Sequence, residues 1–334
     1  MISRGDLEFE LPPELVAQEP IAPRDAARLL LLERATGALS ELRFSDLASQ
    51  ARPEDLFVVN DTRVVPAKLR GTKSSGGKAE ALLLQRRPDG DWTALVKVRG
   101  RVVAGLELVF GELGARVVEV LPGGACRLAL AAPEGVEPDA LLDRIGEAPL
   151  PPYIRRDSAR ARDLADYQTV FAREPGAVAA PTASLHFTEA LAARLRLARV
   201  TLHVGPGTFR PMRCERPEDH VLEPERFAVP EATAQAIADA RAAGGRVVAV
   251  GTTVVRALET TGGAAGAGET KLLVLPGHEF RAVDSLVTNF HLPGSSLLAL
   301  VMAFAGVEAT KRAYAHAIAA RFRFYSYGDA LWIR

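Results

Sequence analysis

The pattern of hydrophobic and polar positions divides the chain into three regions. Residues 8–62 mix short strand and helix signals, and the apolar run 56–59 stops in the polar turn Asn60–Thr62, which is typical of a buried strand that delivers polar groups at its end. Residues 64–130 show short strand-like runs separated by turn signals such as Pro88-Asp89-Gly90. From about residue 167, strand-like runs alternate with helical periods.

The middle region predicts a small antiparallel barrel of about six strands, because no helical period lies between its runs. A helix is expected around Pro138–Ile145, and the proline-rich segment 149–154 follows as a rigid connector. We therefore expect residues 64–148 to form an inserted β-barrel domain, and residues 1–63 with 149–334 to form one discontinuous α/β catalytic domain. The expected barrel strands are Val64–Leu69, Ala79–Arg86, Trp92–Val98, Leu106–Phe110, Ala115–Leu121 and Cys126–Leu130.

The last region predicts a mostly parallel sheet flanked by helices, in which ligands bind beyond the carboxyl ends of the strands. The glycine-rich segment 262–268 is expected to be a flexible surface loop. The expected strands are 176–180, 199–204, 246–250, 271–275 and 285–290, and the expected helices begin at Thr188, Ala232, Thr252 and Ser295.

Polar or glycine-containing segments follow these expected strands. They are Thr182–His186, Gly205–Arg210, Gly251–Thr253 with Arg256, and Asn289–His291. Any one of them is explained equally well as a turn or a helix cap. Together they favour a single crevice, and the helix start at Thr252 offers N–H groups to an anion or a carboxylate.

Several histidines lie in or beside these loops, which makes acid–base chemistry available. We expect general acid–base work from His220 and His291, although a buried histidine is more often structural. No metal-ligand spacing occurs, and Cys126 and Cys214 are too few and too far apart for a zinc or iron–sulfur site. The carboxylates expected nearest the crevice are Asp61, Glu225, Asp284 and Asp329.

Length, composition and net charge limit the class of protein to which the chain can belong. A length of 334 residues suggests two domains, and 48% hydrophobic with 25% charged residues is ordinary for a soluble globular protein. The formal net charge is +0, so any site for a polyanion must be a local patch. The longest strongly apolar run, 297–307, is shorter than the ~18 residues of a membrane span, and the N-terminus lacks the pattern of a signal peptide. We expect a cytoplasmic protein without membrane contact.

Arginines near aromatic residues suggest RNA contact at two places, around Arg155-Arg156 and in Arg321–Tyr327. Guanidinium groups pair with phosphates, and planar side chains stack on unpaired bases. The alternative is a helix face followed by a strand whose aromatic side chains lie in the core.

Taken in order, several segments closely resemble the S-adenosylmethionine:tRNA ribosyltransferase-isomerase family of queuosine biosynthesis. The resemblance covers nearly the whole chain and is loosest in the expected barrel. The segments that carry it are Ala17–Pro20, Pro23–Asp25, Asn60–Ala67, Pro149–Ile154, Tyr167–Val170, Gly176–Ala183, Thr288–Pro293 and Ser326–Ala330.

The resemblance implies an enzyme that uses S-adenosylmethionine as a co-substrate rather than as a methyl donor. The ribosyl group is transferred to 7-aminomethyl-7-deazaguanine at the wobble position of tRNA, giving epoxyqueuosine and releasing adenine and methionine. It implies no metal and no redox cofactor. The expected partners are S-adenosylmethionine and the tRNA anticodon loop that carries the modified base, and the enzyme is expected to be a monomer.

The resemblance also implies roles for individual residues. His220 or Glu225 is expected to remove the proton at C5′, and Asp61 or Asp329 to receive the amine proton. Expected tRNA contacts are Arg155, Arg156, Arg321 and Arg323. Expected contacts with S-adenosylmethionine or the deazaguanine are Thr62, Arg63, Tyr167, Thr182, His186, Gly205, Gly207, Thr208, Gly251, Thr252, Thr253, Arg256, Asp284, Asn289 and His291.

Some positions depart from the family pattern. Glu223 stands where a second histidine is usual, and Gly294 stands where lysine is common. Ser184, Pro206 and Val254 replace a glycine, an alanine and a serine. The departures at Glu223 and Gly294 keep open the hypothesis of an RNA-binding protein that has kept the fold and lost catalysis. The zero net charge is consistent with another hypothesis, a transferase that acts on the free base without RNA.

Overall fold

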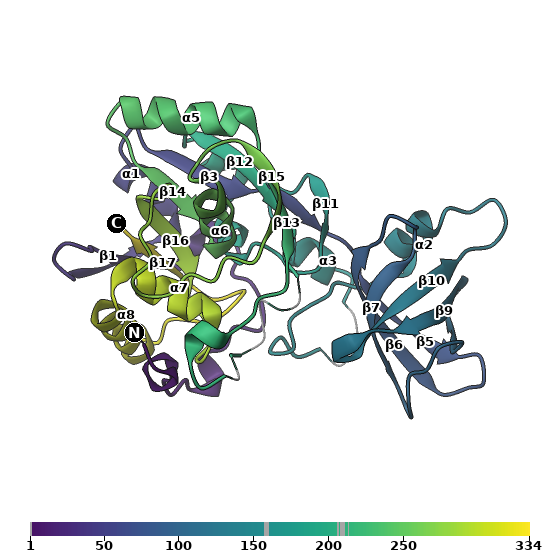
Figure 1. The fold of residues 1–334 in the computed structure, drawn as a ribbon. Helices are drawn as coiled ribbons and strands as arrows, with labels where there is room; N and C mark the ends of the chain where they lie inside the picture. Colours follow the sequence, from purple (N-terminus) through teal and green to yellow (C-terminus); the bar gives the residue numbers. More distant parts are fainter. Residues whose placement is uncertain (1, 157–159, 206, 208–210, 213) are drawn as a thin grey trace.

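A nine-stranded mixed sheet forms the centre of the larger part of the molecule, and a closed barrel projects from it (Figure 1). The computed structural model describes residues 2–156, 160–205, 207, 211–212 and 214–334. In spatial order the sheet strands are β15 (Gly266–Thr270), β13 (Glu225–Val229), β12 (Leu197–Leu202), β3 (Leu56–Asn60), β14 (Val247–Val250), β16 (Ser285–Asn289), β17 (Ala330–Ile333), β1 (Arg28–Leu32) and β2 (Leu39–Arg43).

The central strands are buried on both faces, which explains their continuous apolar runs. Alternate side chains of β3 point to opposite sides, so Leu56 and Val58 join one core while Phe57 and Val59 join the other. The longer helices cover the first core, and short helical turns cover the second. The helices are α1 (Leu47–Gln50), α2 (Pro138–Ile145), α3 (Asp163–Asp166), α4 (Glu189–Ala192), α5 (Glu231–Ala242), α6 (Thr252–Thr261), α7 (Ser296–Ala305) and α8 (Val307–Ala319).

Strand direction decides where the polar ends of the strands meet. The strands β12, β3, β14 and β16 run parallel, so their carboxyl ends share one edge of the sheet. The strand β17 runs antiparallel to β16, and therefore begins at the same edge. The expected α/β fold is confirmed, with the parallel arrangement confined to the centre and antiparallel pairs towards both sides.

Two expected elements were wrong in position. The strand expected at 271–275 lies instead at β15, which begins in the glycine-rich segment 262–268 predicted as a loop and ends at Thr270. Its backbone pairs with β13 at the edge of the sheet, where small exposed side chains suffice and no apolar pattern is required. The strand expected at 176–180 is β11 (Glu174–Ala177), which pairs with β4 (Thr62–Val64) outside the main sheet.

The predicted antiparallel barrel is confirmed as a closed barrel with strand order β10-β7-β6-β5-β8-β9. Its own apolar core also receives Leu141 and Leu142 from α2. The chain enters and leaves the barrel side by side, because Lys68 and Glu147 exchange backbone hydrogen bonds of 3.2 and 2.8 Å. The boundaries of a separate domain at 64 and 148 stay a prediction. The barrel strands are β5 (Lys68–Lys73), β6 (Lys78–Arg86), β7 (Trp92–Val98), β8 (Glu107–Phe110), β9 (Leu113–Val120) and β10 (Ala125–Ala131).

Candidate active site

Asn60 fixes the strand ends from which the site is built. It is fully buried at the end of β3, and its Nδ2 donates to the carbonyl of Leu202 at 2.9 Å and to Oγ1 of Thr253 at 3.2 Å. Its Oδ1 accepts from the N–H groups of Thr62 and Leu202, both at 3.1 Å. One side chain thus joins β3, β12 and the start of α6, satisfying polar groups that would be costly to bury alone.

A small cavity of about 40 Å³ lies beyond these ends, and we refer to it as the deep pocket. It brings together three of the four segments that follow the strands. Gly251 precedes α6 with φ +99°, a backbone conformation that a side chain would strain. The predicted residues that line the deep pocket are Thr182, Gly251, Thr252, Thr253, Asn289 and His291.

The two histidines near the deep pocket are held neutral by burial. His186 accepts from Nδ2 of Asn289 at 3.2 Å and packs on Phe44, with ring centroids 4.9 Å apart. Burial, with some help from the charge of Arg323, lowers the pKa of His186 to about 3. Burial also lowers the pKa of His291 to about 3, and its Nε2 lies 2.8 Å from Oγ1 of Thr288. Both rings position their neighbours as neutral groups at neutral pH.

A larger cavity of about 630 Å³ adjoins the deep pocket, because Leu297 lines both; we refer to it as the open cavity. Its walls come from the segment 219–225, from α6 and from the start of α7. Five predicted residues meet here, which the sequence had placed in three separate segments. They are Gly205, Gly207, His220, Glu225 and Arg256.

An ion pair between Arg256 and Glu225 forms one wall of the open cavity, with only 5% and 7% of the two residues exposed. Nη1 of Arg256 donates to Oε2 of Glu225, and its Nε donates to the carbonyl of Leu272 at 3.0 Å. Oε1 of Glu225 accepts from the N–H of Gly205 at 2.8 Å. Within the part of the chain that the structure describes, Nη2 of Arg256 is buried without a hydrogen-bond partner, which leaves a donor for an anionic ligand.

His220 stands on another side of the open cavity, directly after the turn Pro217–Asp219. The residue is partly exposed, and burial lowers the pKa of its imidazole below the usual value of 6.5. A neutral imidazole within reach of solvent and of a large cavity can accept a proton. Glu223, which stands where the family pattern has a second histidine, lines the same cavity between His220 and Glu225.

Asp61 and Thr62 directly follow β3, and neither of them lines the deep pocket or the open cavity. Oδ1 of Asp61 accepts from the hydroxyl of Thr201 at 2.7 Å, and burial above all raises the pKa of Asp61 from its ordinary value of 3.8. The hydroxyl of Thr62 lies 2.8 Å from Nδ1 of His203. His203 is not among the predicted site residues, because the expected strand 199–204 contained it, whereas β12 ends at Leu202 and leaves His203 directly after the strand.

His203 lines a third cavity, of about 250 Å³, between the sheet and the barrel. This cavity shares Gly205, Glu223 and Glu225 with the open cavity, so the two are neighbours. Barrel residues Gln85 and Thr93 complete it. Burial lowers the pKa of His203, with the charge of Arg226 acting in the same direction, so its ring is neutral at neutral pH.

Other predicted site residues lie elsewhere. The carboxylate of Asp284 accepts from the N–H of Val247 at 2.8 Å, which places it at the amino end of β14, opposite the site. Asp329 lies at the correct edge, but its oxygens accept from the backbone N–H groups of Arg28 and Arg323 at 3.0 and 2.8 Å. It lines a separate depression and not the deep pocket or the open cavity.

Three further predictions concern the surroundings of the site. Tyr167 is fully buried, packs edge-on against Tyr327, and has a hydroxyl pKa well above its ordinary value because of burial. Arg63 lies half-buried on β4. Thr208 lies outside the described residues.

The aromatic residues of the segment 321–327 are core residues, and not a stacking surface for RNA. Phe322 and Phe324 are fully buried, and Phe290 packs against both. Arg323 pairs with Asp329 at 3.2 Å, whereas the side chain of Arg321 is 67% exposed. The core alternative that the sequence left open therefore describes this segment, and of its two predicted tRNA contacts only Arg321 is well exposed.

The backbone conformation at Gly294 explains why glycine stands where lysine is common in the family. Its φ is +65°, and its N–H donates to the carbonyl of Leu7 at 2.9 Å. A Cβ at this position would lie 3.2 Å from Oε1 of Glu8. Glycine adopts this left-handed conformation at little cost, whereas lysine would strain the backbone.

Outside the gaps at 157–159, 206, 208–210 and 213, no three His, Cys, Asp or Glu side chains gather in a way that could hold a metal ion. Among the same residues, no helix has the length and apolar character needed to cross a membrane.

A sheet whose cavities lie beyond the carboxyl ends of its parallel strands is the architecture of an α/β enzyme. A family model described as queuosine biosynthesis protein matches residues 4–333, and the chain belongs to this family. It is 50% identical to the S-adenosylmethionine:tRNA ribosyltransferase-isomerase of Geobacter sulfurreducens, covering 98% of each chain. It is 52% identical to the protein of the same name from Anaeromyxobacter sp. (strain Fw109-5), covering 98% of this chain and 97% of the relative.

A solved structure gives the same result for the fold. The crystal structure of an S-adenosylmethionine tRNA ribosyltransferase from Thermotoga maritima is 34% identical, with a TM-score of 0.56. The match covers 98% of this chain and 100% of that one. The resemblance inferred from short sequence segments is thereby confirmed over the full length.

Proposed function

We propose that this protein transfers and isomerises the ribosyl group of S-adenosylmethionine onto 7-aminomethyl-7-deazaguanine at the wobble position of tRNA. The products are epoxyqueuosine in tRNA, adenine and methionine. The observation that carries the proposal is the open cavity, which presents the neutral His220 and the spare donor of Arg256 to one ligand. The family and its curated relatives support the same reaction.

Arg256 is proposed to bind the carboxylate of the methionine portion. A guanidinium that already pairs with Glu225 through Nη1 can still donate from Nη2 to a second carboxylate. Burial strengthens such a charge-assisted hydrogen bond, because the surroundings screen it less than water does. Glu225 is then a positioning residue, since Gly205 and Arg256 engage both of its oxygens.

His220 is proposed to remove the proton at C5′, beside the positively charged sulfur. The sulfonium makes this carbon acidic, and a neutral imidazole is a suitable acceptor near neutral pH. The electron pair left on carbon drives the rearrangement in which the bond to adenine breaks and adenine departs. The amine of the deazaguanine then bonds to the ribosyl-derived group, and the carbon–sulfur bond breaks so that methionine departs with the electron pair on its sulfur. Glu223, which lines the same cavity, is proposed to balance the charge of the sulfonium.

His203 is proposed to receive the proton that the amine loses, in place of Asp61 or Asp329. The carboxylate of Asp329 is held by backbone N–H groups, and that of Asp61 by Thr201. His203 is neutral, is oriented by Thr62, and lines the cavity beside Glu225. Proton acceptance by a ring held in one orientation needs no rearrangement of the site.

The decisive experiment incubates the protein with S-adenosylmethionine and an anticodon stem-loop that carries the aminomethyl-deazaguanine. The RNA is then weighed by mass spectrometry, and adenine and methionine are assayed. The proposal requires a mass gain of one anhydro-ribosyl unit together with both by-products. A stem-loop with an unmodified guanine is the matched control, because it lacks the attacking amine.

Each other result selects another function. RNA binding without a mass gain indicates an RNA-binding protein that has lost catalysis. Turnover of the free base alone, with no reaction of the stem-loop, indicates a transferase for which RNA is not a substrate.

A further inference from the structure

A basic groove of about 590 Å³ lies where the barrel meets the proline-rich connector, and we refer to it as the connector groove. One wall comes from β5 and Glu147, and the other from the segments 150–156 and 160–164 without Tyr153 and Arg162. Five cationic side chains face two carboxylates in its lining, so the groove is positive in a protein of zero net charge. The charged residues are Lys68, Arg70, Arg155, Arg156, Arg160, Glu147 and Asp163.

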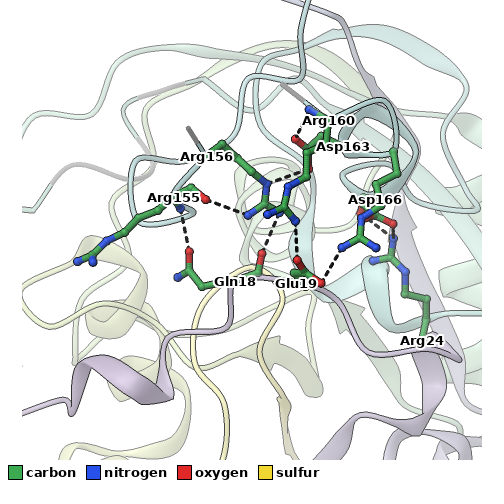
Figure 2. Close-up of polar contacts among 9 residues, drawn as sticks. Gln18, Glu19, Arg24, Arg155, Arg156, Arg160, Asp163 and Asp166 are labelled. Carbon is green, nitrogen blue, oxygen red and sulfur yellow. Dashed lines mark hydrogen bonds and ion pairs between the residues drawn. The ribbon is translucent and has the colours of Figure 1, made fainter. Parts of the chain in front are cut away.

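Some of these cations are engaged in holding the wall together. Figure 2 shows Arg156 between Asp163 and Gln18, with its Nε donating to Oδ1 of Asp163 at 3.1 Å and its Nη2 to the carbonyl of Gln18 at 2.9 Å. Only 7% of its side chain is exposed. Arg160 pairs with Glu19. Arg156, predicted as a tRNA contact, therefore anchors the connector to the N-terminal segment and is not available to RNA.

Lys68 and Arg155 are the cations that remain. Arg70 pairs with Glu147 at 3.0 Å, whereas the described residues provide no carboxylate partner for the side chains of Lys68 and Arg155. The N–H of Arg155 donates to Oε1 of Gln18 at 2.8 Å, which fixes its backbone. Its exposed side chain extends away from Gln18 and Arg156 (Figure 2). The groove thus offers two cations, one from each wall.

The connector separates this groove from the deep pocket. Tyr153 lines the deep pocket, where its hydroxyl lies 2.7 Å from that of Ser326. Its neighbours Pro152 and Ile154 line the connector groove. The connector groove therefore lies across the segment 152–154 from the deep pocket, which itself adjoins the open cavity.

We infer that the connector groove binds the phosphate backbone of single-stranded RNA next to the nucleotide that enters the active site, through Lys68 and Arg155. This inference rests on the proposed function. Lysine binds a phosphate as a point charge, whereas arginine can donate two parallel hydrogen bonds to it as a bidentate ligand. Because the protein has no net charge, attraction to RNA must come from a local patch of this kind.

The test measures binding of a fluorescent anticodon stem-loop by anisotropy over a series of salt concentrations. It compares the wild type with Lys68→Gln/Arg155→Gln. Loss of two phosphate contacts reduces the salt slope by about 1.4, since each single-strand contact contributes ~0.7, and weakens binding at low salt by roughly tenfold. Arg101→Gln is the matched control, because Arg101 is an exposed arginine of the barrel region that does not line the groove.

The two single variants and Arg155→Glu complete the series, with thermal unfolding to verify that each variant folds. We expect each single substitution to lower the salt slope by about half as much as the double variant does. Arg155→Glu should weaken binding more than Arg155→Gln. A double variant with the slope and affinity of Arg101→Gln would overturn the inference. So would a wild type that binds no RNA. Binding through the groove without ribosyl transfer would instead contradict the proposed function alone.

Discussion

The deep pocket and the open cavity lie beyond the same strand ends, yet their polar groups are arranged differently. In the deep pocket most of the bonded polar side chains bind one another, as Asn60 binds Thr253 and Asn289 binds His186, although Oδ1 of Asn289 is buried without a partner among the described residues. In the open cavity the charged guanidinium of Arg256 keeps one donor that no described residue engages, and His220 is partly exposed beside 630 Å³ of space. Groups that satisfy one another stabilise the fold, whereas groups with spare capacity can bind and transform a ligand.

The largest effect is expected from His220→Gln, which removes the proposed base. We expect kcat to fall by about 10²- to 10⁴-fold, the usual contribution of a positioned general base. Steady-state kinetics with saturating S-adenosylmethionine would measure it. Asp219→Asn is the control, because Asp219 lines the same cavity and is not proposed to move a proton.

The pH dependence of the wild type adds a second readout to this variant. The pKa of His220 lies below 6.5, so its neutral form is lost only as the pH falls through that lowered value. We expect kcat/KM to decline on the acid side below about pH 6.5 and the residual activity of His220→Gln to lack this decline. An unchanged acid limb in the variant would contradict the role of His220.

Arg256→Met should affect both stability and substrate binding. It leaves Glu225 buried without its guanidinium, and we expect the free energy of unfolding to fall by about 3–5 kcal/mol. Adding Glu225→Gln removes the unbalanced charge and should restore most of that stability. If Arg256 binds the methionine carboxylate, KM for S-adenosylmethionine stays raised in the double variant. If the double variant recovers both the free energy of unfolding and the wild-type KM, the Arg256–Glu225 pair is structural, like the polar contacts of the deep pocket.

The neutral histidines of the deep pocket predict how stability depends on pH. Burial lowers the pKa of His186 and of His291 from the ordinary value of 6.5 to about 3 in the folded protein, so between these values only the unfolded chain binds the proton. Stability therefore falls as the pH falls below 6.5, by about 1.4 kcal/mol per pH unit for each ring. Denaturant unfolding at several pH values between 7 and 5 measures how steeply the free energy of unfolding falls with pH. In His291→Asn this dependence should be weaker by about 1.4 kcal/mol per pH unit. The same reduction in His316→Asn, a partly exposed histidine of α8 that pairs with Glu41, would contradict this origin.

The smallest effect is expected from Thr253→Val, which removes the acceptor that Asn60 uses in the deep pocket. The side chain keeps its shape, and Asn60 keeps the carbonyl of Leu202. We expect a loss of about 1 kcal/mol in the free energy of unfolding, measured with denaturant. Thr72→Val on the exposed side of β5 should change it by less than about 0.5 kcal/mol. A much larger loss of turnover than of stability would give the deep pocket a chemical role.

Local patterns predicted the elements well where burial determines the sequence. The apolar run ending at Asn60 became β3, and the helix expected at Pro138–Ile145 begins and ends at those residues. The strand β15 was missed because an edge strand of small exposed residues needs only backbone partners. Position along a chain also shows nothing about sheet direction, so the antiparallel pairs at the sides of the sheet appeared only in the structure.

The site was predictable as a set of segments and less so as individual roles. Parallel strands explain why Gly251 and Asn289 meet, since the carboxyl ends of such strands share an edge. Asp284 was misplaced because a carboxylate just before a strand lies at the opposite edge. The pairing of Arg256 with Glu225 joins residues that are 31 positions apart, and no local pattern indicates it.

The paired backbone at Lys68 and Glu147 also bears on how such a molecule can be assembled over evolutionary time. The chain departs for the barrel and returns at neighbouring residues, so the ends that an excision would leave already lie in hydrogen-bonding contact. Insertion, deletion or exchange of the segment between Lys68 and Glu147 can therefore occur without moving the two ends of the chain apart. The hydrogen bonds at this junction join backbone groups, so holding the two ends together does not depend on which side chains stand there.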